Sequence, residues 1–326
     1  MDILLLGGSG WLSGEVARQA VADGHAVTAL ARGRSPVPDG VDLVRADRAE
    51  GGAYDGVTDR DWDLVVDVAW QPGQVRSAVA ALGERAARWV SVSSGSVYRA
   101  TDDPAGDESD PLHEPLAAEI AEGEDYPAAK VACEDAVLEA LGARAVVARA
   151  GLIGGRGDPS DRFGYWPAAF ARAAAGPVLV PAIGAQIVQC ISHADLARWL
   201  LDVGSSTHSG VFDAYGDLIA FSELVAEARA VAGHTGPVVE VDPHDLVSRD
   251  VGYFMGERSL PLWLPVGHEL AVPRRCEKAR TAGLVYRSYR DFLTEVLDDE
   301  RSLGLDRERR SGLSRAAELE LIASMR

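Results

Sequence analysis

Residues 3–21 read ILLLGGSGWLSGEVARQAV, and this stretch decides the fold. Four apolar residues come first, glycines at positions 7, 8 and 10 follow, and an alanine-rich run with helical spacing comes after them. This order predicts a buried strand, a tight turn and a helix.

The glycines of this turn favour a bound dinucleotide. At Gly7 and Gly10, glycine would let a pyrophosphate approach the amides of the helix N-terminus, where the dipole and free N–H groups stabilise an anion. Trp11 and Leu12 follow and would supply such amides. Ser13 stands where the motif has its third glycine, and a side chain this small should preserve the packing of helix on strand. A purely steric use of glycine at a strand-to-helix turn is the alternative.

The same alternation continues along the first 150 residues. Further apolar runs typical of buried strands cover 26–31, 41–46, 63–69, 88–93 and 143–150, and amphipathic runs cover 13–24, 73–86 and 126–142. Strands that alternate with helices predict right-handed crossovers and a doubly wound parallel α/β sheet. We therefore expect a Rossmann domain over residues 1–150.

Beyond residue 150 the chain becomes rich in glycine, proline and aromatic residues. Long loops of this composition often shape a ligand pocket. Residues 151–326 are expected to form mainly a smaller, substrate-binding lobe, with a segment at about 187–215 returning to the Rossmann sheet.

Charge and composition exclude some partners. The chain has 326 residues, 47% of them hydrophobic, and a formal net charge of −18. Without a lysine or arginine stripe to displace counterions, this charge opposes binding to nucleic acid and to anionic membranes. Three widely separated cysteines and the absence of a signal peptide or an apolar spanning run indicate free thiols and a cytoplasmic location.

The second predicted strand indicates which dinucleotide is bound. It ends in VTALARGRS (27–35), which offers Arg32 and Arg34 and no acidic residue. An acidic residue here would bind the ribose 2′-hydroxyl, whereas an arginine accommodates a 2′-phosphate, so NADP(H) is favoured over NAD(H). Solvated loop arginines are the alternative. Asp47, after the third strand, could accept a hydrogen bond from the adenine amino group.

Tyr126 and Lys130 are spaced four residues apart in YPAAK, so they share one face of the predicted helix. A phenol is a poor proton-transfer group near neutral pH unless a neighbouring cation stabilises its phenolate form. Lysine suits this task because its ammonium is a compact charge with three donors, which could also reach the ribose hydroxyls of a cofactor. Lys130 is one of only two lysines among 32 basic residues. A tyrosine that only packs and a solvated lysine form the alternative.

Together with RWVSVSSGSVYR (88–99), these motifs resemble the short-chain dehydrogenase/reductase superfamily. ARAGLIGGRGD (148–158), VQCISHADLARWL (188–200) and KARTAGLVYRSYRDFL (278–293) resemble its extended, NAD(P)-dependent epimerase/dehydratase branch. The resemblance implies that Tyr126 is the acid/base, that Lys130 supports it and binds the ribose, and that Ser94 holds the substrate oxygen. It also implies that Ala69 lies near the nicotinamide ribose and that two helices, one carrying Tyr126, form a homodimer interface.

The chain also departs from this branch. Nucleotide-sugar epimerases usually carry an Asn-Val-Tyr-Gly-Pro type turn after the sixth strand, and here RAGLIGGRGD (149–158) lacks the asparagine. Sugar-nucleotide dehydratases carry an acid and a base directly after the serine, where this chain has Gly95 and Ser96. Simple oxidoreduction needs neither feature.

Three functional hypotheses follow. The first is hydride transfer between a nicotinamide and a carbonyl or carbinol carbon of a small molecule, with Ser96, Arg162, Tyr165 and Trp166 as candidate substrate contacts. The second is a sugar or nucleotide-sugar epimerase. The third is a non-catalytic cofactor sensor or RNA-associated protein, which the motif residues and the charge oppose. The scattered histidines give no support for a metal site.

Overall fold

The computed structural model describes residues 1–99, 105–265, 268 and 272–325. The chain divides into two compact units. Unit 1 contains Met1–Gly151, His193–Tyr215 and Arg274–Val285, and unit 2 contains Leu152–Ser192, Gly216–Pro273 and Tyr286–Arg326. Each unit has its own hydrophobic core.

Unit 1 is built on a parallel sheet. Among the described residues its seven strands are β1 (Asp2–Leu6), β2 (Ala26–Ala31), β3 (Val41–Arg45), β4 (Trp62–Asp67), β5 (Ala86–Ser94), β6 (Ala145–Ala150) and β11 (Gly210–Ala214). Their order is β11-β6-β5-β4-β1-β2-β3, and every pair is parallel. The order reverses between β1 and β4, which is where ligands bind in open α/β sheets.

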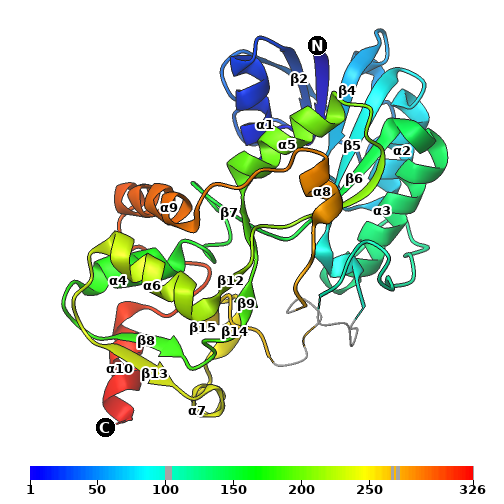
Figure 1. Cartoon of the computed structure of the whole chain (residues 1–326). Helices are drawn as coiled ribbons and strands as arrows, with labels where there is room; N and C mark the ends of the chain where they lie inside the picture. Colours follow the sequence, from blue (N-terminus) through cyan, green and yellow to red (C-terminus); the bar gives the residue numbers. More distant parts are fainter. Residues whose placement is uncertain (100–104, 266–267, 269–271, 326) are drawn as a thin grey trace. The chain divides into compact units, whose positions relative to one another are not determined.

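Helices cover both faces of this sheet. The longer helices of unit 1 are α1 (Trp11–Ala22), α2 (Pro72–Leu82), α3 (Tyr126–Leu141) and α5 (His193–Gly204), and α8 (Glu277–Thr281) is short. Figure 1 shows α1 and α5 packed together on one face and α2 and α3 on the other. Because the inner strands are buried on both faces, they read as largely apolar runs, whereas the edge strand β3 is partly exposed. Ile3 to Leu6 are completely buried, for example.

The doubly wound parallel sheet predicted from the sequence is confirmed. Differences are confined to the ends of elements. The run at 63–69 forms β4 only up to Asp67, because the side chain of Asp67 accepts a hydrogen bond from the amide of Ala69 and turns the chain. The helix expected at 13–24 begins earlier, at Trp11, directly after the glycine turn.

Unit 2 is a smaller assembly of short strands and helices around an aromatic core. Its strands pair as β7 (Leu152–Gly154) with β10 (Cys190–Ser192), β8 (Val178–Pro181) with β13 (Val238–Val241), β9 (Ile187–Val188) with β12 (Ile219–Ala220), and β14 (Gly252–Phe254) with β15 (Ser259–Pro261). The helices are α4 (Tyr165–Ala173), α6 (Phe221–Ala232), α7 (Pro243–Val247), α9 (Tyr289–Leu303) and α10 (Arg315–Ser324). Among the helices described in either unit, none has both the length and the apolar character that a bilayer span requires.

Candidate active site

The glycine turn after β1 is held in a tight conformation. Gly7 has φ +87°, a region that other residues rarely adopt, and its amide donates to the carbonyl of Leu30 at 2.9 Å. A Cβ atom built on Gly8 would lie 2.5 Å from the Cβ of Ala29. Helix α1 begins with Gly10 as N-cap and has no side-chain cap. The positive end of the α1 dipole therefore lies at the glycine turn, which suits an anionic ligand.

Ser13 braces this turn. Its hydroxyl donates to the carbonyl of Gly7 at 2.7 Å and lies 3.2 Å from the carbonyl of Gly10, and the side chain is buried. The serine that replaces the third glycine of the motif thus fits the helix–strand contact and adds hydrogen bonds that a glycine could not make.

The residues expected around the adenosine end of a cofactor lie after β2 and β3. Arg32 and Arg34 are exposed, and Gly33 between them has φ +70°. A Cβ atom built on Gly33 would lie 2.8 Å from Nε of Arg45, so a third arginine packs beside this turn. Sequence reasoning missed Arg45 because it lies at the end of a different strand. Asp47 is half-buried and accepts a hydrogen bond from the amide of Ala49 at 3.1 Å.

Tyr126 and Lys130 stand on the first turns of α3. The ammonium of Lys130 lies 6.0 Å from the centroid of the Tyr126 ring. It donates to the carbonyl of Ala69 at 2.8 Å and to the carbonyl of Val92 at 2.7 Å, and the residue is only 4% exposed. Lys130 is therefore not a solvated lysine. It joins the loop after β4, the end of β5 and the helix that carries Tyr126.

Trp70 contacts the same tyrosine and was not anticipated. Its ring centroid lies 5.5 Å from that of Tyr126, with the planes inclined by 54°. Trp70 directly follows Ala69 in the sequence. The expected position of Ala69 near the nicotinamide could therefore have identified Trp70 as a neighbour of the site. An indole therefore lies beside the phenol of Tyr126.

The serines at the end of β5 have different environments. Ser93 is buried and donates to Glu134, whereas Ser94 is half-buried. The hydroxyl of Ser94 accepts from the amide of Ser96 and donates to its hydroxyl, both at 3.2 Å. The hydroxyl of Ser94, unlike that of Ser93, is therefore part of the turn that follows β5, where it contacts Ser96.

Gly95 cannot carry a side chain in this arrangement. A Cβ atom built on it would lie 1.7 Å from the hydroxyl oxygen of Tyr215. Tyr215 is buried and comes from the segment that follows β11. The position where sugar-nucleotide dehydratases carry an extra acid is therefore filled by a tyrosine hydroxyl in this chain.

A buried polar cluster lies at the same end of the sheet. Arg149 on β6 pairs with Glu134 on α3 at 2.7 Å and donates to the hydroxyl of Tyr98 at 2.9 Å. Tyr98 donates in turn to Asp213 on β11 at 2.6 Å, and Arg274 donates to the other oxygen of Asp213 at 2.9 Å. Burial raises the pKa of Asp213 to about 6, although Arg274 and the hydrogen bond from Tyr98 act in the opposite direction.

The residues of unit 2 that were expected to contact substrate differ in their burial. Tyr165 and Trp166 are completely buried in its core, where Trp166 packs edge-on against both Tyr165 and Phe221. This placement favours packing over substrate contact. Arg162 is half-buried, with Nε 3.0 Å from the hydroxyl of Ser160 and its guanidinium over the ring of Phe254.

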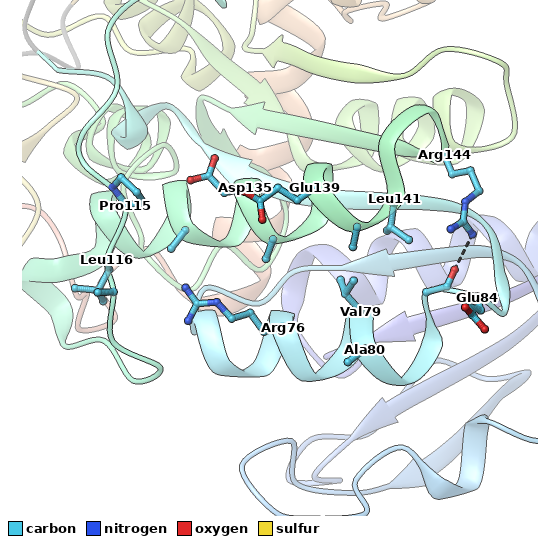
Figure 2. Close-up of a pocket in the computed structure, with 15 residues that line it drawn as sticks. Arg76, Val79, Ala80, Glu84, Pro115, Leu116, Asp135, Glu139, Leu141 and Arg144 are labelled. Carbon is cyan, nitrogen blue, oxygen red and sulfur yellow. Dashed lines mark hydrogen bonds between the residues drawn. The ribbon is translucent and has the colours of Figure 1, made fainter.

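A surface groove runs between α2 and α3 in unit 1 (Figure 2). It has a volume of about 930 Å³. Arg76 and Val79 line it from α2, and Asp135 and Glu139 line it from α3. Burial, followed by the like charges of Glu134 and Glu139, raises the pKa of Asp135.

Comparison with known proteins establishes the fold. No family model matches the chain, and no curated protein matches it by sequence. Solved structures do resemble it over nearly its whole length. One is UDP-glucuronic acid 4-epimerase from Bacillus cereus in complex with NAD, with a TM-score of 0.68 and 14% identity, covering 93% of this chain and 99% of that one.

Two further structures have the same coverage of this chain, 93%. UDP-glucose 4-epimerase from Thermotoga maritima with UDP-glucose has a TM-score of 0.67 and 15% identity over 99% of its own chain. dTDP-glucose 4,6-dehydratase from Bacillus anthracis in complex with NAD has a TM-score of 0.66 and 14% identity over 97% of its chain. The chain has the fold of these epimerases and dehydratases, which agrees with the resemblance seen in the sequence motifs.

Proposed function

We propose that this chain is a nicotinamide-dependent enzyme that oxidises a carbinol carbon or reduces a carbonyl carbon of a small molecule. One observation carries this proposal. Lys130 is a buried ammonium, held by the carbonyls of Ala69 and Val92, one helical turn from Tyr126. A buried cation beside a phenol is the arrangement that proton transfer by tyrosine requires.

The residues of unit 1 fit a dinucleotide. A Cβ atom built on Gly8 would collide with Ala29, Gly7 has φ +87°, and α1 begins directly after this turn. The amides of Trp11 and Leu12 would hold the pyrophosphate, and Ala69 would contact the nicotinamide ribose. When bound, such a cofactor supplies the group that accepts or returns hydride.

Tyr126, Ser94 and Lys130 would have different roles in the reaction. Tyr126 would exchange a proton with the substrate oxygen, and Ser94 would donate a hydrogen bond to that oxygen and orient it. Two of the three N–H groups of Lys130 are engaged by carbonyl oxygens of the described residues, which leaves one for a ribose hydroxyl or the phenol. Trp70 would limit the space beside Tyr126. Ser96 and Arg162 remain candidate substrate contacts.

We propose NADP(H) as the preferred form of the cofactor, with NAD(H) as the alternative. The support is electrostatic, since Arg32 and Arg34 are exposed after β2 and Arg45 packs against Gly33 between them. Arginine side chains after the second strand suit a 2′-phosphate. Two of the three solved structures named above are complexes with NAD, so the two forms must be compared directly by titration.

Epimerisation of a sugar or nucleotide sugar is the second candidate, because two of the similar structures are 4-epimerases. The two activities differ in cofactor balance. An oxidoreductase changes the redox state of the cofactor with each turnover, whereas an epimerase returns the hydride to the same molecule. The nicotinamide absorbance during turnover therefore separates them. Dehydration has less support, since Tyr215 fills the space beside Gly95.

We further propose a homodimer formed through α2 and α3. Ala132, Ala136 and Ala140 recur every fourth residue on α3 and line the groove between the two helices. A ridge of such small residues allows another helix to approach closely. The groove presents Arg76 from one helix and Asp135 and Glu139 from the other, so a copy related by a two-fold axis meets opposite charges.

The Tyr126→Phe variant tests the catalytic proposal. It keeps the ring but removes the proton donor, so turnover of carbonyl substrates should fall by about 10²- to 10⁴-fold. The measurement is nicotinamide oxidation over a panel of ketones and sugars. Cofactor affinity, measured by fluorescence titration, should change little, which shows that the site is intact. A Tyr126→Phe enzyme that turns over at the wild-type rate would contradict the proposal.

A further inference from the structure

The chain of contacts that ends at Lys130 begins at a buried ion pair. Arg48, just after β3, and Asp67, the last residue of β4, face each other with NH1 2.8 Å from Oδ1 and NH2 2.8 Å from Oδ2. Asp67 is completely buried and the side chain of Arg48 is 7% exposed. Burial acts to lower the pKa of Arg48, but the ion pair with Asp67 raises it above the ordinary arginine value. The guanidinium therefore stays charged.

Other contacts fix the guanidinium on its remaining sides. NH2 of Arg48 also donates to the carbonyl of Gln74 at 2.8 Å, and Nε donates to the hydroxyl of Tyr54 at 3.1 Å. Tyr54 donates to the same carbonyl of Gln74 at 3.0 Å. The loop after β3 is thus tied to the first turn of α2, and Asp67 is held against a rigid partner.

Asp67 in turn fixes the loop that follows β4. Its Oδ1 accepts a hydrogen bond from the amide of Ala69 at 2.9 Å, in addition to the one from Arg48. The carbonyl of Ala69 then accepts from the ammonium of Lys130 at 2.8 Å. Asp67 therefore orients the residue that supplies one of the two carbonyls holding Lys130, the other being that of Val92.

We propose that Arg48 and Asp67 are positioning residues for Lys130, acting through the backbone of Ala69. The inference rests on the role proposed above for Lys130. A buried ion pair is a costly way to add stability, because well-packed apolar side chains often do as well. A bidentate pair, however, fixes the direction of a carboxylate in a way that apolar packing does not. The sequence alone does not reveal this role, because Arg48 and Asp67 are 19 residues apart.

The lysine content of the chain offers a direct test. Lys130 and Lys278 are its only lysines, so selective labelling with ¹⁵N at lysine gives two ammonium signals in an NMR spectrum. The Lys278→Arg variant assigns them. In the Asp67→Ala protein the Lys130 ammonium should exchange its protons with water at least about ten-fold faster, because its Ala69 acceptor is no longer held. Asp67→Asn keeps an oxygen for the Ala69 amide and should lie closer to wild type.

Two further variants complete the design. Asp63→Ala is the matched control, because this exposed carboxylate at the start of the same strand accepts a hydrogen bond from the amide of Asp2 and lies away from the Arg48 pair. Arg48→Lys retains charge but cannot bridge both oxygens of Asp67, so its effect should be intermediate. A folded Asp67→Ala protein with wild-type exchange at Lys130 overturns the inference. If that protein does not fold, wild-type exchange in a folded Arg48→Lys protein overturns it equally.

Kinetics separate this inference from the proposed function. Displacement of Lys130 should lower kcat by about 10- to 100-fold with little change in the substrate KM, and move the midpoint of the pH–rate profile upward. Faster exchange at Lys130 with unchanged turnover would support the positioning of Lys130 and contradict its catalytic role. Slower turnover with unchanged exchange would contradict the positioning and leave the catalytic role standing.

Discussion

One of the two lysines of this arginine-rich chain, Lys130, lies at the centre of the proposed site. Lys130 fits between the carbonyls of Ala69 and Val92 at 2.8 and 2.7 Å. An ammonium can donate in three directions from one point, whereas a guanidinium spreads its donors over a rigid plane. A Lys130→Arg change would therefore keep the charge and lose the geometry.

Gly95 offers a prediction at the scale of one residue. Gly95→Ala should destabilise the protein by about 1–3 kcal/mol, because the new methyl group would meet the hydroxyl of Tyr215 and force the turn after Ser94 to move. Chemical denaturation measures the loss, and turnover should fall with it because Ser94 moves as well.

Two further proteins control this prediction. The space around Gly123 is open, so Gly123→Ala should leave stability nearly unchanged. Adding Tyr215→Phe to Gly95→Ala removes the nearest colliding atom and should recover part of the loss. Equal stability of the Gly95→Ala and Gly123→Ala proteins would show that the contact with Tyr215 is not limiting.

Tyr126 and Lys130 could be proposed as site residues because their spacing is a local sequence pattern, and Ser94 could be proposed from the resemblance of residues 88–99 to a known superfamily. A spacing of four residues on a helix places two side chains on one face, and serines at the end of an apolar run fall at the edge of a sheet. Contacts between distant segments could not be found in this way. Gly95 meets Tyr215 although β6 lies between β5 and β11 in the sheet, and Arg48 meets Asp67 although β1 and β2 lie between β3 and β4.

At the scale of elements, burial explains what was predictable. The inner strands of the unit 1 sheet are mainly apolar and buried on both faces, so their runs are visible in the sequence. Tyr165 and Trp166 were harder to place, since an aromatic pair beside a glycine-rich loop suits either a pocket wall or a core. The structure packs them with Phe221, inside unit 2.

Asp213 on β11 accepts a hydrogen bond from Arg274, which lies just before α8, and its contribution to stability should depend on pH. The ordinary pKa of an aspartate is 3.8, and burial raises that of Asp213 to about 6. The folded protein then binds the proton more tightly than the unfolded chain, so this residue contributes stability below about pH 4 that is lost as the pH rises through 6. The full effect is about 3 kcal/mol.

Asp213→Asn isolates this contribution. Urea unfolding at several pH values should show the variant gaining stability relative to wild type between pH 4 and pH 7. Asp23→Asn is a useful control, because that carboxylate is exposed and pairs with Arg198 at the surface. If wild type instead gains stability relative to the Asp213→Asn protein over this range, the hydrogen bonds from Arg274 and Tyr98 outweigh burial, and the direction given above is wrong.

At the scale of the whole molecule, the groove between α2 and α3 predicts the oligomeric state. Ala136→Arg would place a long charged side chain on the alanine ridge and should convert a homodimer to monomers. Sedimentation velocity measures the change as a halving of the mass. Ala323→Arg on α10 is the control, since that position is exposed. A wild-type protein that sediments at the 34.5 kDa of one chain would contradict the dimer.

The order of segments in unit 1 has a consequence for its synthesis. The sheet is complete only when β11 pairs with β6, and β11 follows a long excursion of the chain into unit 2. While the ribosome makes residues 152–209, the nascent protein carries β6 as an open edge, although every residue of this strand is buried in the finished protein. Unpaired edges of this kind invite association with other chains. Conditions that slow translation through this interval should therefore favour aggregation of newly made protein.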